Sequence, residues 1–161
     1  MSETAKHRAI FLPYCIGNGL DIGYGGDPIT ETAITLDQAE RYSFEGSKPQ
    51  NLTADAASLY MFADNALDYV YSSHCIEDFR DTAEVLIEWL RVVKAGGYLC
   101  LLFPDEQVYQ LRSRTPNDAH VHYNFGLQFI VTRLPENTTL IFGQELFADD
   151  DYNCAIVVQK C

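Results

Sequence analysis

Hydrophobic residues follow two patterns along the chain, and together these patterns predict alternating strands and helices. Short runs rich in branched and aromatic residues predict strands at 19–23, 32–37, 51–55, 66–72 and 98–103. The last of these, "YLCLLF", is apolar throughout, as in a strand covered on both faces. Two further runs, 138–147 and 152–160, flank a polar turn and predict an antiparallel hairpin.

Helical spacing of apolar residues occurs three times. Ala5, Ala9 and Leu12 predict a short amphipathic helix over 4–12 that Pro13 ends. The next helix follows Asp81, ends at Lys94 and the Gly96-Gly97 pair, and carries one apolar stripe made of Ala83, Leu86, Ile87, Leu90 and Val93. A third helix, over 127–134, ends before Pro135.

Strands and helices in alternation, followed by a hairpin, predict an α/β fold with a mostly parallel sheet. The length of 161 residues and the 47% hydrophobic content predict a single domain over 1–161. Only the residues 27–36 separate Gly26 from Asp37, which is too few for a crossover helix and a strand. We therefore expect a shortened first crossover.

Charge and cysteine content narrow the classes of function. Lys and Arg number 11 against 23 Asp and Glu, so the formal net charge of −12 disfavours a nucleic-acid substrate or an anionic membrane surface. The five cysteines form no C-x-x-C pair, which favours a reducing cytoplasm. No run of 18 apolar residues is present, so we expect no membrane insertion.

Glycines crowd the end of the first predicted strand, where backbone amides can approach a ligand closely. A dinucleotide fingerprint starting at Gly23 requires a glycine at position 28, but Pro28 stands there, which weakens the alternative of a nucleotide-binding oxidoreductase. Asp21, two residues before Gly23, instead favours a ligand that carries positive charge.

Three stretches then resemble, in the right order, the motifs of one family. They are "LDIGYGG" (20–26), "LTADAASLYMFADNALDYVYSSHCIEDF" (52–79) and "DTAEVLIEWLRVVKAGGYLCLLFPD" (81–105). The sequence resembles the class I, Rossmann-like S-adenosylmethionine (SAM)-dependent methyltransferases of the small type-11 group. The resemblance implies a sheet of order 3-2-1-4-5-7-6 with an antiparallel C-terminal hairpin, SAM as cofactor, and methyl transfer. The similarity to bacterial members of sugar and polysaccharide biosynthesis implies a small-molecule or saccharide acceptor.

The resemblance also implies roles for single residues. Asp21, Gly23 and Gly25 would hold the methionine end of the cofactor, and Asp37 would accept the ribose hydroxyls. The alternative for these carboxylates is an ordinary turn with a satisfied aspartate.

The remaining candidates follow the third and fourth predicted strands. Asp55 and Ala56 would read adenine, although Asp55 also suits a plain loop. Ser72, Ser73 and His74 lie where the family passes the methyl group, and His74 is the candidate catalytic group near the acceptor. A structural hydrogen bond is the alternative for this histidine. Other titratable choices are Glu77, Asp78, His120 and His122.

Departures from the family pattern keep a second function open. Tyr24 stands where the family has Cys or Ser, and Asp78 replaces a histidine. A SAM-binding regulatory or accessory domain without turnover is therefore the alternative. We expect no metal site, because His120 and His122 lack a third ligand motif and Asp149–Asp151 suits a solvated turn. A second copy or a partner chain would cover the site.

Overall fold

The computed structural model describes residues 1–38, 49–112, 117 and 119–161. Its strands are β1 (Gly19–Ile22), β2 (Ile34–Asp37), β3 (Leu52–Thr53), β4 (Leu67–Ser73), β5 (Val93–Pro104), β6 (Thr138–Leu146) and β7 (Asn153–Lys160). Its helices are α1 (Glu3–Phe11), the 3-10 turn η1 (Ile76–Asp78), α2 (Thr82–Val92), α3 (Glu106–Arg112) and α4 (Leu127–Val131).

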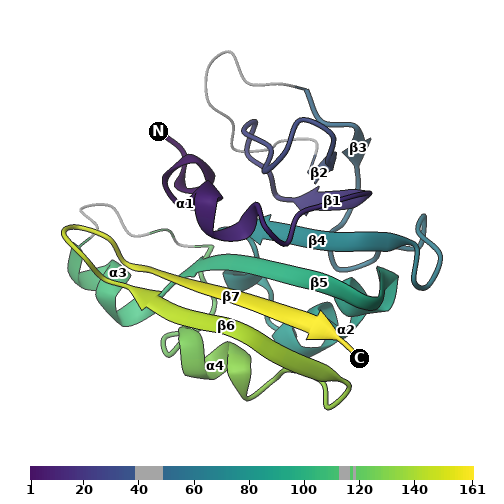
Figure 1. Cartoon of the computed structure of the whole chain (residues 1–161). Coiled ribbons are helices and arrows are strands. Elements are labelled where there is room, and N and C mark those ends of the chain that lie inside the picture. Colours follow the sequence, from purple (N-terminus) through teal and green to yellow (C-terminus); the bar gives the residue numbers. More distant parts are fainter. Residues whose placement is uncertain (39–48, 113–116, 118) are drawn as a thin grey trace.

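The strands form a seven-stranded sheet of order β3-β2-β1-β4-β5-β7-β6 (Figure 1). The pairs from β3 to β5 are parallel, and β7 runs antiparallel to both β5 and β6. This arrangement confirms the predicted α/β class, the strand order and the C-terminal hairpin. Parallel strands bring the carboxyl ends of β1, β2 and β4 to one edge of the sheet.

Two apolar layers cover the two faces of the sheet. On one face, Leu86 and Trp89 of α2 pack with Leu99 and Leu101 of β5. On the other face, Phe11 of α1 packs with a cluster that contains Tyr69, Tyr71, Cys100, Leu102, Ala155 and Val157. Residues of β5 alternate between the layers, which explains why this strand is apolar throughout.

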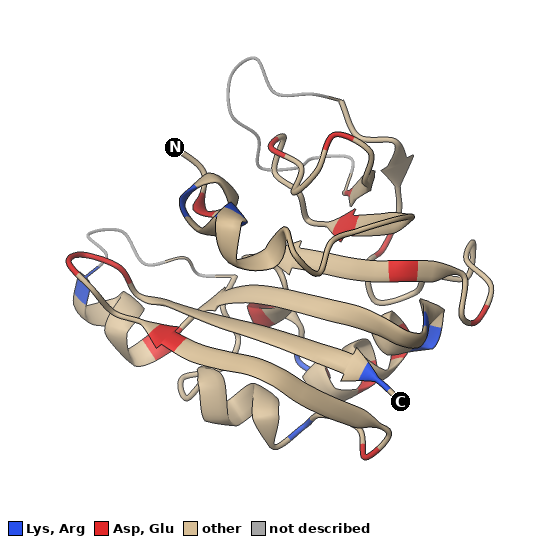
Figure 2. Ribbon diagram, viewed as in Figure 1, with Lys and Arg blue, Asp and Glu red and all other residues tan. Residues whose placement is uncertain are grey.

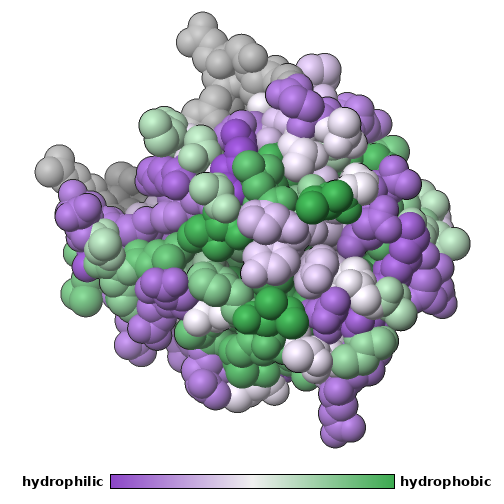
Figure 3. All heavy atoms as spheres, in the orientation of Figure 1, coloured by the Kyte–Doolittle hydropathy of each residue, from purple (hydrophilic) through white to green (hydrophobic). Residues whose placement is uncertain are grey.

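The second face is covered only in part by helix. Among the described helices, α1 packs on this face near β1 and β4, and none lies over β5, β7 and β6 in Figure 1. Figure 3 shows hydrophobic side chains gathered over these strands. The partly buried apolar residues that pack against the cluster here are Ile10, Tyr14, Tyr98, Phe142 and Leu146.

The structure corrects the predicted buried face of α1. Ala5, Ala9 and Leu12 are exposed, whereas Thr4 and Phe11 are buried. Phe11 is drawn inward because its ring packs edge-on against Tyr71, with the centroids 5.2 Å apart. Helical spacing of small apolar residues therefore indicated the helix but not its orientation.

The apolar stripe and the end of α2 also differ from the expectation. Ala83 and Ile87 are exposed, and the helix instead buries Val85 and Trp89 beside Leu86 and Leu90. The helix ends at Val92, and the left-handed Gly96 (φ +79°) lies within the range of β5, where it turns the chain into the apolar run. Asp81 is the N-cap residue but makes no capping side-chain hydrogen bond.

The first crossover is short, as the spacing of Gly26 and Asp37 predicted. Residues 23–33 form turns and bends without a helix. None of the helices in the described part of the chain is long and apolar enough to cross a membrane. Acidic side chains, which outnumber basic ones by 23 to 11, are spread over loops and strand ends (Figure 2).

Candidate functional site

A cavity of about 780 Å³ lies at the carboxyl ends of β1 and β4. Gly23, Tyr24 and Gly25 line it after β1, and Ser73 and His74 line it at the end of β4. The other lining residues are Met1, Ser2, Glu3, Thr4, Asp78, Tyr109, Asn117, Ala119 and Tyr152. Ligands of open α/β sheets collect at this edge, and the volume suits a small molecule.

The glycine turn after β1 depends on bare backbone. Gly23 and Gly25 have φ angles of +65° and +57°, a region that favours glycine. A Cβ built on Gly23 would lie 2.8 Å from Cβ of Cys75, so a side chain would collide there as well. The turn therefore forms a narrow cradle on the cavity wall.

Asp21 lies beneath this turn and does not line the cavity. Its side chain is fully buried, and Oδ2 accepts a hydrogen bond from the Ile29 N–H at 2.6 Å. Burial raises the pKa of Asp21 well above its usual range, and nearby Asp27 adds to the effect. Oδ1 is buried and has no hydrogen-bond partner among the described residues. An unpaired carboxylate oxygen under a glycine cradle fits a ligand that brings a positive charge.

Asp37 ends β2 and braces the same turn. Its Oδ2 accepts a hydrogen bond from the Gly25 N–H at 3.3 Å, and its Oδ1 accepts one from the Gln38 N–H at 2.8 Å. The side chain is half-buried at the sheet edge. Carboxylate oxygens have further lone pairs, so Asp37 can still accept from a ligand hydroxyl.

Asp55 and Ala56 lie outside the lining of the large cavity. Asp55 is exposed, and its Oδ1 accepts from the Ala57 N–H at 2.9 Å, which is the loop role considered as the alternative. Ala56 is buried, and its carbonyl accepts from Nε1 of Trp89 at 2.8 Å. A role of this pair toward adenine stays a prediction.

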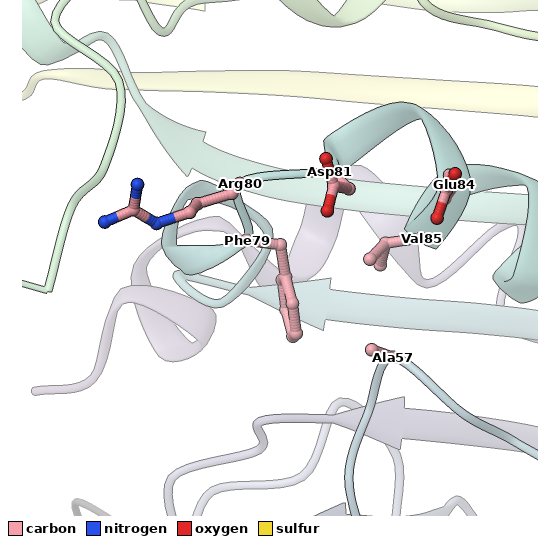
Figure 4. A pocket seen from close by; sticks show the side chains of 6 residues that line it. All are labelled: Ala57, Phe79, Arg80, Asp81, Glu84 and Val85. Carbon is pink, nitrogen blue, oxygen red and sulfur yellow. The ribbon is translucent and has the colours of Figure 1, made fainter.

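A second, smaller hollow of about 180 Å³ adjoins this loop. Its lining residues are Ala57, Phe79, Arg80, Asp81, Glu84 and Val85. Phe79 and Val85 reach toward Ala57, and the Arg80 guanidinium points away from them (Figure 4). The small hollow shares no lining residue with the large cavity.

The end of β4 places Ser73 and His74, but not Ser72, on the cavity wall. Ser72 is buried and donates to the carbonyl of Ile22 at 3.0 Å, which ties β4 to β1. Ser73 and His74 line the cavity. His74 has a φ of +51°, a conformation that costs a non-glycine residue energy and is typical of functional sites.

Both ring nitrogens of His74 have polar neighbours. Nε2 lies 2.6 Å from Oδ1 of Asn153, and Nδ1 lies 3.5 Å from Oε1 of Glu77. Burial lowers the pKa of His74, whereas burial raises the pKa of Glu77 well above its usual range. A neutral imidazole beside the cavity can accept a proton from a bound group.

The other titratable candidates lie in different surroundings. Asp78 lines the cavity, and His120 contacts Glu106, with Nδ1 2.7 Å from Oε2. His122 instead packs with Phe125 and Phe129, so the two imidazoles do not form a common site. The described residues contain no group of three or more His, Cys, Asp or Glu side chains that could hold a metal ion.

Sequence reasoning missed several residues at this site. Glu3, Tyr109 and Tyr152 line the cavity, and Asn153 bonds His74 across 79 positions of sequence. Asn153 also donates to Glu3 across 150 positions. Contacts of this range leave no periodic signal, because they depend on which strands become neighbours.

Comparisons with known proteins agree with this geometry. The family model described as a methyltransferase domain matches residues 20–101, just over half of the chain. No curated protein matches the sequence.

Solved structures share the fold at low identity. The PH0226 protein from Pyrococcus horikoshii OT3 has 20% identity and a TM-score of 0.74, over 98% of this chain and 89% of that one. A SAM-dependent methyltransferase from Archaeoglobus fulgidus has 21% identity and a TM-score of 0.70, over 98% and 92%. One from Mesorhizobium loti has 13% identity and a TM-score of 0.74, over 99% and 98%.

Proposed function

We propose that this chain methylates a small-molecule or saccharide acceptor, since it belongs to the methyltransferase domain family and takes SAM as its cofactor. The observation that carries this proposal is the 780 Å³ cavity at the carboxyl ends of β1 and β4. Its wall combines the glycine cradle with His74, so one space offers a place for the cofactor's methionine end and a polar group for the acceptor.

Each predicted cofactor residue has a part in this proposal. Gly23 and Gly25 would cradle the methionine end above the buried Asp21, and Asp37 would accept the ribose hydroxyls. Asp55 and Ala56 would read adenine, and Ser72 and Ser73 would frame the passage of the methyl group. When bound, SAM supplies an electrophilic methyl group on a sulfonium, and the chain contributes mainly position, which is worth about 7 to 11 kcal/mol at best.

The acceptor side of the cavity suits a neutral polar molecule. Tyr109 and Tyr152 offer aromatic surface, and Asp78 and Asn117 offer groups that bind hydroxyls. No lysine or arginine belongs to the described lining, which disfavours a phosphorylated acceptor and, with the net charge of −12, a nucleic acid. A saccharide or a similar polyhydroxyl compound fits this wall.

A domain that binds the cofactor without turnover is the second candidate. It is favoured by two departures from the family pattern, Tyr24 and Asp78, both of which line the cavity. This alternative shares the cofactor residues and differs only on the acceptor side.

Two measurements test the proposal. Isothermal titration should show binding of S-adenosylhomocysteine and none of NAD, and incubation with methyl-labelled SAM should transfer label to a saccharide or small hydroxyl compound. If S-adenosylhomocysteine binds but no label is transferred to any glycan, lipid or phenolic pool, the second candidate is supported. Binding of NAD alone overturns the cofactor assignment.

Two glycine variants provide the matched comparison. Gly23→Ala places a Cβ against Cys75 in the cradle, whereas Gly96→Ala imposes a similar left-handed strain where a Cβ meets nothing within 4 Å. We expect Gly23→Ala to abolish cofactor binding and Gly96→Ala to retain it. Equal losses in both variants would mean that general destabilisation, not the cradle, governs binding.

We also propose a bacterial-type cytoplasmic setting and a partner that covers the cavity, either a second copy or another chain. The partly uncovered sheet face over β5, β7 and β6 supports an association surface (Figure 3). Light scattering at several concentrations tests self-association, and a mass that stays monomeric throughout contradicts the second-copy form.

A further inference from the structure

Four alternating basic and acidic side chains lie in a buried row beside the cavity. His74, Glu77, His120 and Glu106 form this row, which we call the acid–base row. Oε1 of Glu77 lies 3.5 Å from Nδ1 of His74 and 3.8 Å from Nε2 of His120. The side chains of Glu77, His120 and Glu106 are 2%, 6% and 4% exposed, so bulk water screens them little.

Asn153 determines which nitrogen of His74 carries the proton. The amide is buried, and its Nδ2 donates to Oε2 of Glu3 at 2.9 Å and to Oδ1 of Asp151 at 2.7 Å. Carboxylates accept but do not donate at neutral pH, so the amide nitrogen must face them and the amide oxygen must face His74. Nε2 of His74 therefore donates, and Nδ1 of the neutral ring keeps a lone pair.

That lone pair belongs to a residue that lines the cavity. Nδ1 of His74 makes no hydrogen bond with the described residues, and the ring lines the cavity. The titratable groups that flank the ring are Glu3 and Lys6 of α1, Glu77 of η1, His120, and Asp151 and Tyr152 of the β6–β7 hairpin. Burial lowers the pKa of His74 and raises that of Glu77, which favours an uncharged pair before reaction.

We propose that the acid–base row and Asn153 make His74 a general base that acts through Nδ1, and that the methyl acceptor is therefore a hydroxyl group. Asn153 and Glu77 are positioning residues, since they act through His74. This inference rests on the proposed methyltransferase function and adds the acceptor's reactive group to it.

The step balances as a proton transfer coupled to methyl transfer. A lone pair of the hydroxyl oxygen forms the bond to the methyl carbon, and the C–S bond breaks with its electron pair left on sulfur. The hydroxyl proton goes to Nδ1 of His74, so the positive charge lost by the sulfonium ends on the imidazolium. Glu77, whose Oε1 lies 3.5 Å from Nδ1, can then accept a hydrogen bond from the new N–H.

A base of this kind matters for one class of acceptor. A neutral amine attacks with its own lone pair and can lose its proton afterwards, whereas a hydroxyl oxygen becomes a good nucleophile only as its proton leaves. Three further titratable groups, Glu77, His120 and Glu106, lie behind the imidazole of His74, and this arrangement suits an oxygen acceptor.

Nitrogen-15 NMR of the whole, labelled chain tests the tautomer without any turnover. Long-range ring spectra, assigned with His74→Gln, should show neutral His74 protonated at Nε2 at pH 7. Asn153→Leu should give a mixture of tautomers, because no amide oxygen then accepts from Nε2. Gln159→Leu, at the far end of β7, is the matched control and should leave the His74 signals unchanged. A ring protonated at Nδ1 in the wild-type chain overturns the inference.

Turnover separates this inference from the function on which it rests. Monosaccharides, each paired with its 2-amino-2-deoxy counterpart, are incubated with labelled SAM. A methyl ether as product, lost about 100-fold or more in His74→Gln, supports the inference. Label on nitrogen only contradicts the inference and keeps the methyltransferase proposal. Cofactor binding without label on any sugar counts against both, whereas the NMR result still decides the tautomer.

Discussion

The two crossovers that flank β1 and β4 are built in opposite ways. Between β1 and β2 the chain makes turns over residues 23–33, whereas between β4 and β5 it forms η1 and α2. The first buries Ile29 and Ala33 in the apolar cluster of the second face. It is also held by polar contacts, among them the Arg8–Asp27 ion pair, with Nη2 2.6 Å from Oδ1, and a hydrogen bond from Ser2 to Asp27. The second buries Leu86, Trp89 and Leu90 in the sheet's apolar layer.

This difference separates stability from ligand binding. Each large apolar side chain buried by α2 contributes about 1.5 to 3 kcal/mol, whereas a partly exposed ion pair contributes roughly 0 to 1 kcal/mol. The turn crossover buries fewer large apolar side chains than α2 does, but it places Gly23 and Gly25 on the cavity, above Asp21 of β1. We expect substitutions in α2 to change the free energy of unfolding and substitutions around the glycine turn to change cofactor affinity.

The largest effect is expected from Trp89→Ala. It leaves a cavity in the apolar layer and removes the hydrogen bond to the Ala56 carbonyl, so unfolding should become easier by about 3 to 5 kcal/mol. Because Trp89 is the single tryptophan, chemical denaturation should be followed by circular dichroism. Trp89→Phe should lose less. A loss below about 1 kcal/mol for the alanine variant would contradict the role assigned to α2.

Asp37→Ala should act mainly on the cofactor. Loss of a charged acceptor at the sheet edge corresponds to about 1.5 to 3 kcal/mol, or roughly 10- to 100-fold weaker binding of S-adenosylhomocysteine in calorimetry. Asp68→Asn is the control, because Asp68 lies at the start of β4 and pairs with Lys94, away from the cavity. Equal affinity in wild type and Asp37→Ala would remove this residue from the binding site.

Asp21 should make the free energy of unfolding depend on pH. Burial holds the pKa of Asp21 in the folded chain above its unfolded value, so the folded state binds more protons and stability falls as pH rises through that interval. Glu77 acts with the same sign, because its pKa is also raised by burial.

Asp21→Asn should flatten this pH dependence in part. The amide carries no charge to bury, so the variant should be more stable than wild type at pH 8 by on the order of 1 to 3 kcal/mol. The difference should shrink at pH 4, as melting curves at several pH values would show. Its cofactor affinity should fall, because the carboxylate under the cradle is gone. Parallel melting profiles for the two chains would argue against a buried, strained carboxyl.

The smallest effect is expected from Arg8→Gln. The Arg8 and Asp27 side chains are 31% and 33% exposed, so their ion pair should contribute less than about 1 kcal/mol and weaken with salt. Melting curves at low and high salt provide the measurement. A loss of several kcal/mol would mean that α1 depends on this contact more than on Phe11.

Local sequence predicted the elements with a clear hydrophobic pattern. The apolar run of β5, the terminal hairpin and the short spacing before Asp37 were each confirmed, because burial on both faces, hairpin alternation and chain length act over a few residues. The expectation missed α3, whose residues 106–112 are largely polar and carry little apolar periodicity.

The tertiary structure decided which faces and which distant side chains meet. Phe11 turned α1 away from its predicted face because Tyr71 of the sheet gave its ring a partner. Asn153 reached His74 only because β7 returns antiparallel to β5, which ends beside β4. Motif spacing by itself indicated the glycine turn and the family. Only the packed sheet decided which side chains face the ring of His74, because Asn153 and Glu3 lie far from it in the chain.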